Sequence, residues 1–142
     1  MRILFVCLGN ICRSPAAEGV MRELAPDLTV DSAGTGGWHV GDPPYPPMQE
    51  AANTRGFDLS DLRARQFTRA DFDEFDLIIA MDRQNKADIE RLRPAGNKTP
   101  VRLLTDSDVP DPYFTRDFDA ALDVIEKAAR RLLADISRWR DR

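Results

Sequence analysis

The sequence predicts an α/β fold with three layers, α/β/α, in which helices cover both faces of a four-stranded parallel sheet. Short apolar runs that suit buried strands alternate along the chain with amphipathic segments that suit helices. The first run, residues 3–6, is apolar throughout, as expected of a strand buried on both faces. Ser14 and Pro15 behind it have the form of a helix N-cap followed by proline at the first helical position.

The other elements follow from the same patterns. Strands are expected at residues 3–6, 28–32, 76–81 and 101–104. Helices are expected at residues 14–24, 48–54, 83–92 and from 118 to the chain end, with a short helical turn within 68–74. Asp82 is the expected cap of the third of these helices. Residues 105–115 are expected to form a polar loop near Cys7, because both follow strands of one parallel sheet.

Size and charge limit the function classes. A chain of 142 residues suits one domain, 1–142, that can bury a sizeable core. The net charge of −4 argues against nucleic-acid binding, which usually needs a basic face. The N-terminal apolar run is too short to span a membrane, and no signal-peptide cleavage pattern follows it.

Cysteine and histidine are scarce. The two cysteines, Cys7 and Cys12, lie in one segment and do not form a disulfide scaffold of the secreted type. Because His39 is the only histidine, a four-ligand zinc site is not expected, and neither is any other metal or cofactor. We therefore expect a cytoplasmic protein with mostly free thiols, and export without a signal peptide stays open.

The segment from Cys7 to Ser14 has the composition of a cradle for a tetrahedral oxyanion. A loop between a strand end and a helix start turns backbone N–H groups inward, and the helix adds the positive end of its dipole. Arg13 adds a planar, bidentate positive group, and Gly9 permits unusual backbone angles. The same field favours the nucleophilic thiolate of Cys7, to which the Ser14 hydroxyl can donate. The pattern predicts phosphoryl transfer through a phosphocysteine.

A simple anion-binding loop with two buried structural cysteines is the alternative, since free cysteine is among the most buried residue types. The combination of Cys7 with Arg13 and Ser14, between a buried strand and a proline-started helix, favours catalysis.

Residues 6–15, with the sequence Val-Cys-Leu-Gly-Asn-Ile-Cys-Arg-Ser-Pro, closely resemble the signature of the low molecular weight protein tyrosine phosphatases. The resemblance extends from residue 2 to about residue 135. It implies a phosphate-binding loop between the first strand and the first helix, with Cys7 as nucleophile and Arg13 as phosphate ligand. The other loop residues implied to bind phosphate are Leu8, Gly9, Asn10, Ile11, Cys12 and Ser14.

Two further segments agree with this resemblance. Residues 31–35 match the family's Asp-Ser-Ala-Gly-Thr segment, which implies that Ser32 supports the phosphate loop together with Asn10. Trp38 falls in the loop that forms one wall of the family's substrate cleft. The alternative for Trp38 is a purely structural role, as a loop residue that covers the core.

A cysteine nucleophile also needs an acid for the leaving group, and one carboxyl group can protonate that group and later activate water. Asp111 lies between two prolines that limit where its carboxylate can point. It could also be an ordinary residue of an acidic turn. The family's Asp-Pro-Tyr segment favours Asp111 as general acid and Tyr113 as an aromatic of the pocket wall.

Some positions depart from the family pattern. Leu62 stands where the family often has a histidine that contacts the loop asparagine, so Asn10 needs another partner. A loop containing glycine commonly follows Asp-Pro-Tyr, whereas residues 114–117 here contain none. His39 is expected on the surface. Tyr45 is expected to pack in an exposed position, and a regulatory phosphorylation site is the alternative for it. Cys12 is either a packed small residue or a partner that captures oxidised Cys7 as a disulfide.

Three functions compete on these residues. An arsenate reductase of similar fold would need further cysteines downstream, and none follows Cys12. A phosphopeptide-binding module would not need both Cys7 and Asp111. We therefore expect a metal-independent, cysteine-dependent phosphatase for phosphotyrosine. The resemblance implies this substrate rather than phosphoarginine, because related phosphatases that act on phosphoarginine carry threonine where this chain has Ile11. The expected partner is a phosphotyrosine-containing protein, such as a tyrosine kinase, and the chain is expected to be a monomer, with weak self-association left open.

Overall fold

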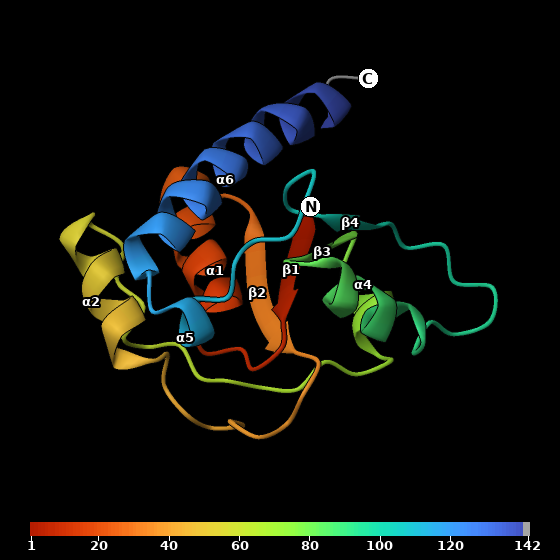
Figure 1. Cartoon of the computed structure of the whole chain (residues 1–142). Helices are drawn as coiled ribbons and strands as arrows, with labels where there is room; N and C mark the ends of the chain where they lie inside the picture. Colours follow the sequence, from red (N-terminus) through yellow and green to blue (C-terminus); the bar gives the residue numbers. More distant parts are fainter. Residues whose placement is uncertain (141–142) are drawn as a thin grey trace.

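The computed structural model describes residues 1–140 and is built on a four-stranded, all-parallel sheet (Figure 1). The strands are β1 (Arg2–Cys7), β2 (Thr29–Gly34), β3 (Leu77–Ala80) and β4 (Val101–Leu103), in the spatial order β2-β1-β3-β4. In the register of the sheet, Cys7 pairs with Gly34, and Val6 pairs with both Ala33 and Ala80. The carboxyl ends of the strands therefore meet at one edge of the sheet.

Helices cover both faces of this sheet, which confirms the predicted three-layer α/β/α fold. Their bounds are α1 (Arg13–Leu24), α2 (Pro46–Thr54), α3 (Asp71–Glu74), α4 (Arg83–Glu90), α5 (Pro112–Thr115) and α6 (Phe118–Arg140). Helix α1 packs against both β2 and α6, and α2 packs against α6. Helix α4 packs on the other side, against β3 and β4.

The core is divided by the sheet, as the alternation of side chains along β1 shows. Ile3, Phe5 and Cys7 belong to the larger apolar cluster under α1, α2 and α6, whereas Leu4 and Val6 belong to the cluster with α3 and α4. All five side chains are buried, so β1 is covered on both faces as its apolar sequence predicts. Each fully buried aliphatic or aromatic side chain contributes about 1.5–3 kcal/mol to folding.

Two local predictions were wrong, and one was confirmed. Helix α1 begins at Arg13 with Cys12 at its N-cap, so Ser14 is not the cap, because its hydroxyl is engaged by Cys7 and Asn10 instead. The expected loop 105–115 contains the one-turn helix α5. Asp82 does cap α4, accepting a hydrogen bond from the Asn85 amide at 2.7 Å.

Residues 141 and 142, which belong to the predicted domain and to its predicted C-terminal helix, lie outside the described residues. Among residues 1–140, the structure has no helix with the length and apolar character that a membrane crossing needs.

Candidate active site

The predicted nucleophile, Cys7, is the last residue of β1 and is 3% exposed. Its Sγ lies 3.0 Å from the Ser14 Oγ and accepts a hydrogen bond from the Asn10 amide at 3.3 Å. Ser14 Oγ in turn accepts from the Asn10 side-chain amide at 2.8 Å. The Ser14 hydroxyl can donate to a thiolate at Cys7, and its other acceptor is the more distant Ala33 carbonyl at 3.4 Å.

Asn10 holds the turn of the loop in its unusual shape. Its φ is 57°, in the left-handed region that asparagine tolerates better than most residues. The side-chain amide donates to Ser14 and also to Ser32 Oγ at 3.0 Å, as the family resemblance implies. The side-chain oxygen accepts from the Arg65 backbone amide at 3.0 Å. Arg65 thus supplies the partner that Leu62, which is buried in the core, does not.

Glu18 extends this chain of hydrogen bonds to the buried face of α1. The Ser32 hydroxyl donates to Glu18 Oε1 at 2.7 Å, and Arg22 pairs with Glu18 Oε2 at 3.1 Å. Burial is the largest influence on this carboxyl and raises the pKa of Glu18 above its ordinary value of 4.5. Sequence reasoning missed Glu18, although a glutamate among the apolar residues of a core helix is a signal for a buried polar network.

We expect Glu18→Gln to change how stability depends on pH. A carboxyl whose folded pKa is raised stabilises the fold most below its unfolded value, and this contribution is lost as pH rises through the folded pKa. Relative to the glutamine variant, the wild type should therefore lose free energy of unfolding as pH rises above 4.5. Urea unfolding across this range measures the difference, with Glu23→Gln, an exposed glutamate of α1, as the matched control. Parallel pH profiles for wild type and Glu18→Gln would contradict the assignment.

Arg13 lies at the start of α1 and is 2% exposed. Its guanidinium donates to Asp82 Oδ2 at 2.8 Å, to the Val109 carbonyl at 2.9 Å and to Asp111 Oδ2 at 3.4 Å. Burial by itself lowers the pKa of Arg13, but the negative partners Cys7, Asp82 and Asp111 outweigh burial and raise it above its ordinary value. Asp82 follows β3 and orients the Arg13 guanidinium through this hydrogen bond. From the sequence, Asp82 was predicted only as a helix cap.

The predicted acid, Asp111, is the N-cap of α5 and accepts from the Tyr113 amide at 3.1 Å. Its other oxygen faces Arg13. The preceding Val109 is buried and is fixed by its amide, which donates to the Met81 carbonyl at 2.9 Å. Asp111 therefore reaches the phosphate loop from a segment anchored to the end of β3.

A cavity of about 170 Å³ opens above Cys7. The loop residues Leu8, Gly9, Ile11, Cys12 and Arg13 line it, together with Trp38, His39, Asp111, Tyr113 and Phe114. Asn10 and Ser14, which were also expected to bind phosphate, do not line the cavity but support it from below. Trp38, Phe114 and Tyr113 are 73%, 72% and 41% exposed, so the mouth of the cavity is aromatic and open to solvent.

His39 and Phe114 are wall residues that sequence reasoning missed. His39 was expected on the surface, but its ring lies beside Gly9 and 6.4 Å from the ring of Tyr113. A Cβ at Gly9 would lie 3.2 Å from the His39 ring, so glycine permits this approach. No local pattern marks either residue, because both reach the wall only through loops that fold over the phosphate loop.

Cys12 faces the same cavity as Cys7. Burial, followed by the negative charges of Cys7 and Asp111, raises the pKa of the Cys12 thiol to about 12. Cys12 therefore stays a neutral thiol at physiological pH.

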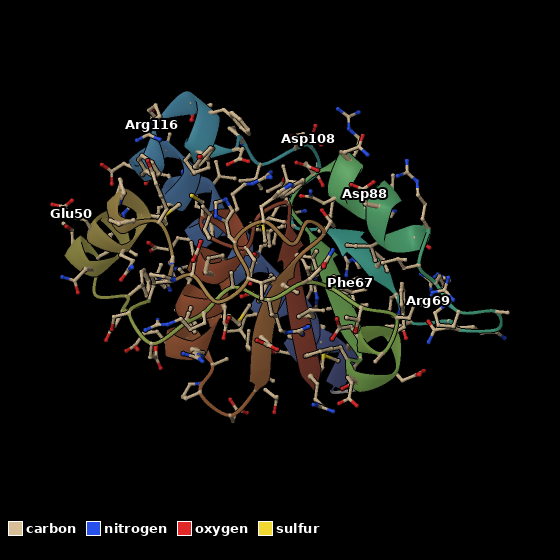
Figure 2. All side chains as sticks on the ribbon, turned by 90° about the horizontal axis from the view of Figure 1, so that it is seen from below. Glu50, Phe67, Arg69, Asp88, Asp108 and Arg116 are labelled. Carbon is tan, nitrogen blue, oxygen red and sulfur yellow. The ribbon has the colours of Figure 1, made fainter. Side chains whose placement is uncertain are left out.

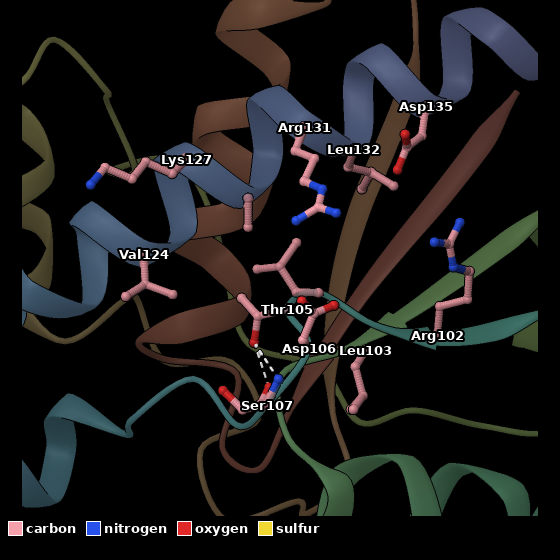
Figure 3. Close-up of a pocket in the computed structure, with 12 residues that line it drawn as sticks. Arg102, Leu103, Thr105, Asp106, Ser107, Val124, Lys127, Arg131, Leu132 and Asp135 are labelled. Atoms are coloured by element: carbon pink, nitrogen blue, oxygen red, sulfur yellow. Dashed lines mark hydrogen bonds between the residues drawn. The ribbon is translucent and has the colours of Figure 1, made fainter.

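A second, wider cleft of about 450 Å³ lies between α6 and the segment from β4 to Ser107 (Figure 3). Arg102 of β4 lines it, and so do Lys127 and Arg131 of α6. It contains neither cysteine and none of the predicted site residues. The reactive groups are gathered in the smaller cavity.

Comparison with known proteins agrees with this geometry. The family model of low molecular weight phosphotyrosine protein phosphatases matches residues 2–141. The chain belongs to this family. A putative low molecular weight protein-tyrosine-phosphatase of Synechocystis is 42% identical, with 97% of this chain and 98% of that protein covered.

Solved structures agree with the family model. The crystal structure of YfkJ from Bacillus subtilis has a TM-score of 0.92 at 40% identity, covering 97% of this chain and 95% of that chain. A drosophila arginine phosphatase, DARP, has a TM-score of 0.90 at 32% identity, covering 96% and 98%. The present chain is therefore an enzyme, a protein-tyrosine-phosphatase, and its family implies phosphoprotein substrates. The resemblance found in residues 6–15 of this phosphatase is thereby confirmed.

Proposed function

We propose that the phosphatase hydrolyses phosphotyrosine in proteins through a phosphocysteine on Cys7, with Asp111 as general acid and then general base. The observation that carries the proposal is the meeting of Cys7, Arg13 and Asp111 at one small cavity with an aromatic mouth. The first two come from the ends of β1 and α1, and the third comes from a distant loop held by Arg13 itself.

In the first step the Cys7 thiolate attacks phosphorus from the floor of the cavity. The S–P bond forms, the P–O bond to tyrosine breaks, and the proton of Asp111 passes to the leaving oxygen. Arg13 and the inward N–H groups of the loop hold the phosphoryl oxygens as their charge redistributes. Tyrosine leaves through the open mouth.

In the second step water attacks the phosphocysteine. Asp111, now ionised, takes a proton from that water, the S–P bond breaks, and the electron pair returns to Cys7 as a thiolate. Ser14 stabilises the thiolate as leaving group, because its hydroxyl lies 3.0 Å from Sγ. Inorganic phosphate departs, and Asp111 is protonated again for the next turnover.

The walls of the cavity favour an aryl phosphate. Trp38 and Tyr113 can contact the two faces of a phenyl ring, and a short phosphoserine would present no ring to them. Phosphoarginine is the second candidate, because the drosophila relative is named an arginine phosphatase. Ile11 in the wall is aliphatic and offers no hydrogen bond to a guanidinium, which favours phosphotyrosine.

We further propose that residues 1–142 form one phosphatase domain that acts as a monomer in the cytoplasm without a metal or cofactor. Its substrate would be a phosphotyrosine-containing protein, such as a tyrosine kinase. The single domain and the substrate class rest on the family model, and the cytoplasm and the metal-free site rest on the two free cysteines and the single histidine.

The deciding experiment compares three peptides of one sequence that carry phosphotyrosine, phosphoserine or phosphoarginine, in EDTA and reductant. Phosphate release from phosphotyrosine at a kcat/KM at least about 100-fold above the others is the expected result. Preferred release from phosphoarginine would replace the substrate assignment. A requirement for added metal would contradict the mechanism.

A further inference from the structure

Tyr45 touches the phosphate loop through its backbone. Its amide donates to the Ile11 carbonyl at 2.8 Å, at the point where the chain enters α2. The ring of Tyr45 is half-buried rather than exposed, contrary to the sequence expectation. It packs against the core cluster beneath α1 and α6. One end of this residue is thus fixed to the loop that carries the predicted phosphate ligands.

The ring of Tyr45 touches the segment that carries the acid. It meets the Tyr113 ring edge-on, with centroids 5.4 Å apart, and lies 5.9 Å from the ring of Phe118. Tyr113 is only two residues from Asp111 and donates its own amide to that carboxylate. Tyr45 therefore links the two segments, because its backbone binds the phosphate loop and its ring contacts the acid segment.

Arg116 closes the same link from the turn between α5 and α6 (Figure 2). Its guanidinium donates to the Tyr45 hydroxyl at 3.1 Å and lies 5.2 Å from the Tyr45 ring centroid and 5.4 Å from that of Phe118. Its backbone amide donates to the Pro112 carbonyl at 2.8 Å, which ends α5. Its φ of 64° is a left-handed value that a residue with a side chain adopts only where its surroundings enforce it.

A helix of four residues, like α5, is not stable in isolation. The free-energy cost of fixing the backbone of the first turn exceeds the free energy gained from its hydrogen bonds. The position of its N-cap, Asp111, must therefore come from contacts outside the helix, which are its own contact with Arg13 and the contacts at the two ends of the segment. At the first end, Val109 is tied to Met81 and Arg13. At the second end, Arg116 contacts Tyr45 and Phe118, and Tyr113 contacts Tyr45. The Tyr113 ring also lies 6.4 Å from that of His39, and its carbonyl accepts from the Arg116 guanidinium at 3.4 Å.

We propose that Tyr45 and Arg116 are positioning residues that form an aromatic–cation clamp and hold Asp111 over the phosphate loop. This rests on the proposed function of Asp111 as the acid. The clamp acts through the placement of a one-turn helix, so its loss should weaken proton transfer to the leaving group while the phosphate cradle stays intact. The clamp assigns a role to Tyr45. It also explains why an arginine occupies position 116, where the left-handed backbone would favour glycine, because the Arg116 side chain is needed for the contact.

The test uses Tyr45→Ala, Arg116→Gly and the double variant, with Tyr45→Phe as the conservative replacement and Arg91→Ala, an exposed arginine of the α4 end, as matched control. Glycine suits the left-handed backbone, so Arg116→Gly removes the side chain without new strain. The substrates are phenyl phosphate and 4-nitrophenyl phosphate, since phenol is the poorer leaving group and depends more on an acid.

We expect kcat/KM for phenyl phosphate to fall about 10-fold in Tyr45→Ala and Arg116→Gly, and that for 4-nitrophenyl phosphate to fall about 3-fold or less. The double variant should lose little more than each single variant, because both residues belong to one contact. Tyr45→Phe should keep most of the activity, and inhibition by inorganic phosphate should be unchanged throughout. Amide exchange at residues 115 and 116 should be faster in Tyr45→Ala than in wild type.

Asp111→Asn distinguishes failure of the acid assignment from failure of the clamp proposal. If wild type and Asp111→Asn do not differ in leaving-group dependence, the acid assignment falls, and this proposal falls with it. If Asp111→Asn shows the dependence but the clamp variants lose both substrates equally or neither, and exchange at 115 and 116 is unchanged, only the clamp is overturned.

Discussion

Replacing Cys7 by serine is expected to abolish phosphatase turnover, by about 10⁴-fold or more, while phosphate still binds. Serine keeps the size of the residue and its place at the end of β1, where it remains buried beside Ser14. A hydroxyl at this position is not ionised near neutral pH, so it cannot replace a thiolate as nucleophile. The anion cradle of Arg13 and the loop amides does not depend on the sulfur and should persist.

Two measurements check this prediction. Rapid mixing with excess 4-nitrophenyl phosphate should show a burst of nitrophenol in wild type and none in Cys7→Ser, and calorimetry should show similar affinities for inorganic phosphate. Cys12→Ser is the comparison within the same loop. Because Cys12 is a buried neutral thiol, we expect it to cost about 10-fold or less. Substantial turnover by Cys7→Ser would show that another group attacks phosphorus.

The centre of this site could be predicted from the sequence because it is local. Cys7, Arg13 and Ser14 lie within eight consecutive residues, and a buried strand followed by a helix fixes how they face one another. The role of Asp111 needed the family resemblance, since an acidic loop far along the chain is ordinary in itself. The structure then brings Asp111 within 3.4 Å of Arg13.

The parts that sequence reasoning missed depend on tertiary contacts. The sequence marks Glu18 at most as a buried polar residue and Asp82 as a helix cap, and their partners Ser32 and Arg13 are found only in the folded structure. Ser14 was assigned as a cap because its residue type suits one, but its hydroxyl has a stronger use at Cys7. The helix α5 was missed although Asp111 and Pro112 form an N-cap followed by proline at the first helical position, because residues 105–115 were assigned as a whole to a polar loop.

Asp111→Asn is the second large effect that we expect, a fall of about 10²–10⁴-fold that is greatest for poor leaving groups. Asparagine is isosteric with aspartate and is also a good N-cap, so it can still accept from the Tyr113 amide and keep α5 in place. What it lacks is the transferable proton. The substitution therefore tests proton transfer with little change of structure.

The measurement is kcat/KM across a series of aryl phosphates whose phenols differ in acidity. Wild type should show a shallow dependence on leaving-group acidity, because Asp111 neutralises the developing phenolate, whereas Asp111→Asn should show a steep one. Asp106→Asn, an exposed aspartate of the same loop, should stay within about 2-fold of wild type. An equal loss for all phenols would mean that Asp111 acts on Arg13 through their contact and not on the substrate.

The two substitutions also divide the catalytic cycle. Cys7→Ser stops the cycle before any covalent step, so no phosphoenzyme can form. Asp111→Asn impairs both the formation and the hydrolysis of the phosphocysteine, since one carboxyl group serves as acid and then as base. With a good leaving group the first step should need little acid, and Asp111→Asn should then accumulate phosphocysteine. Trapping it by rapid acid quench and mass analysis of the Cys7 peptide would test the nucleophile and the base in one experiment, and an unmodified Cys7 during turnover would contradict the covalent mechanism.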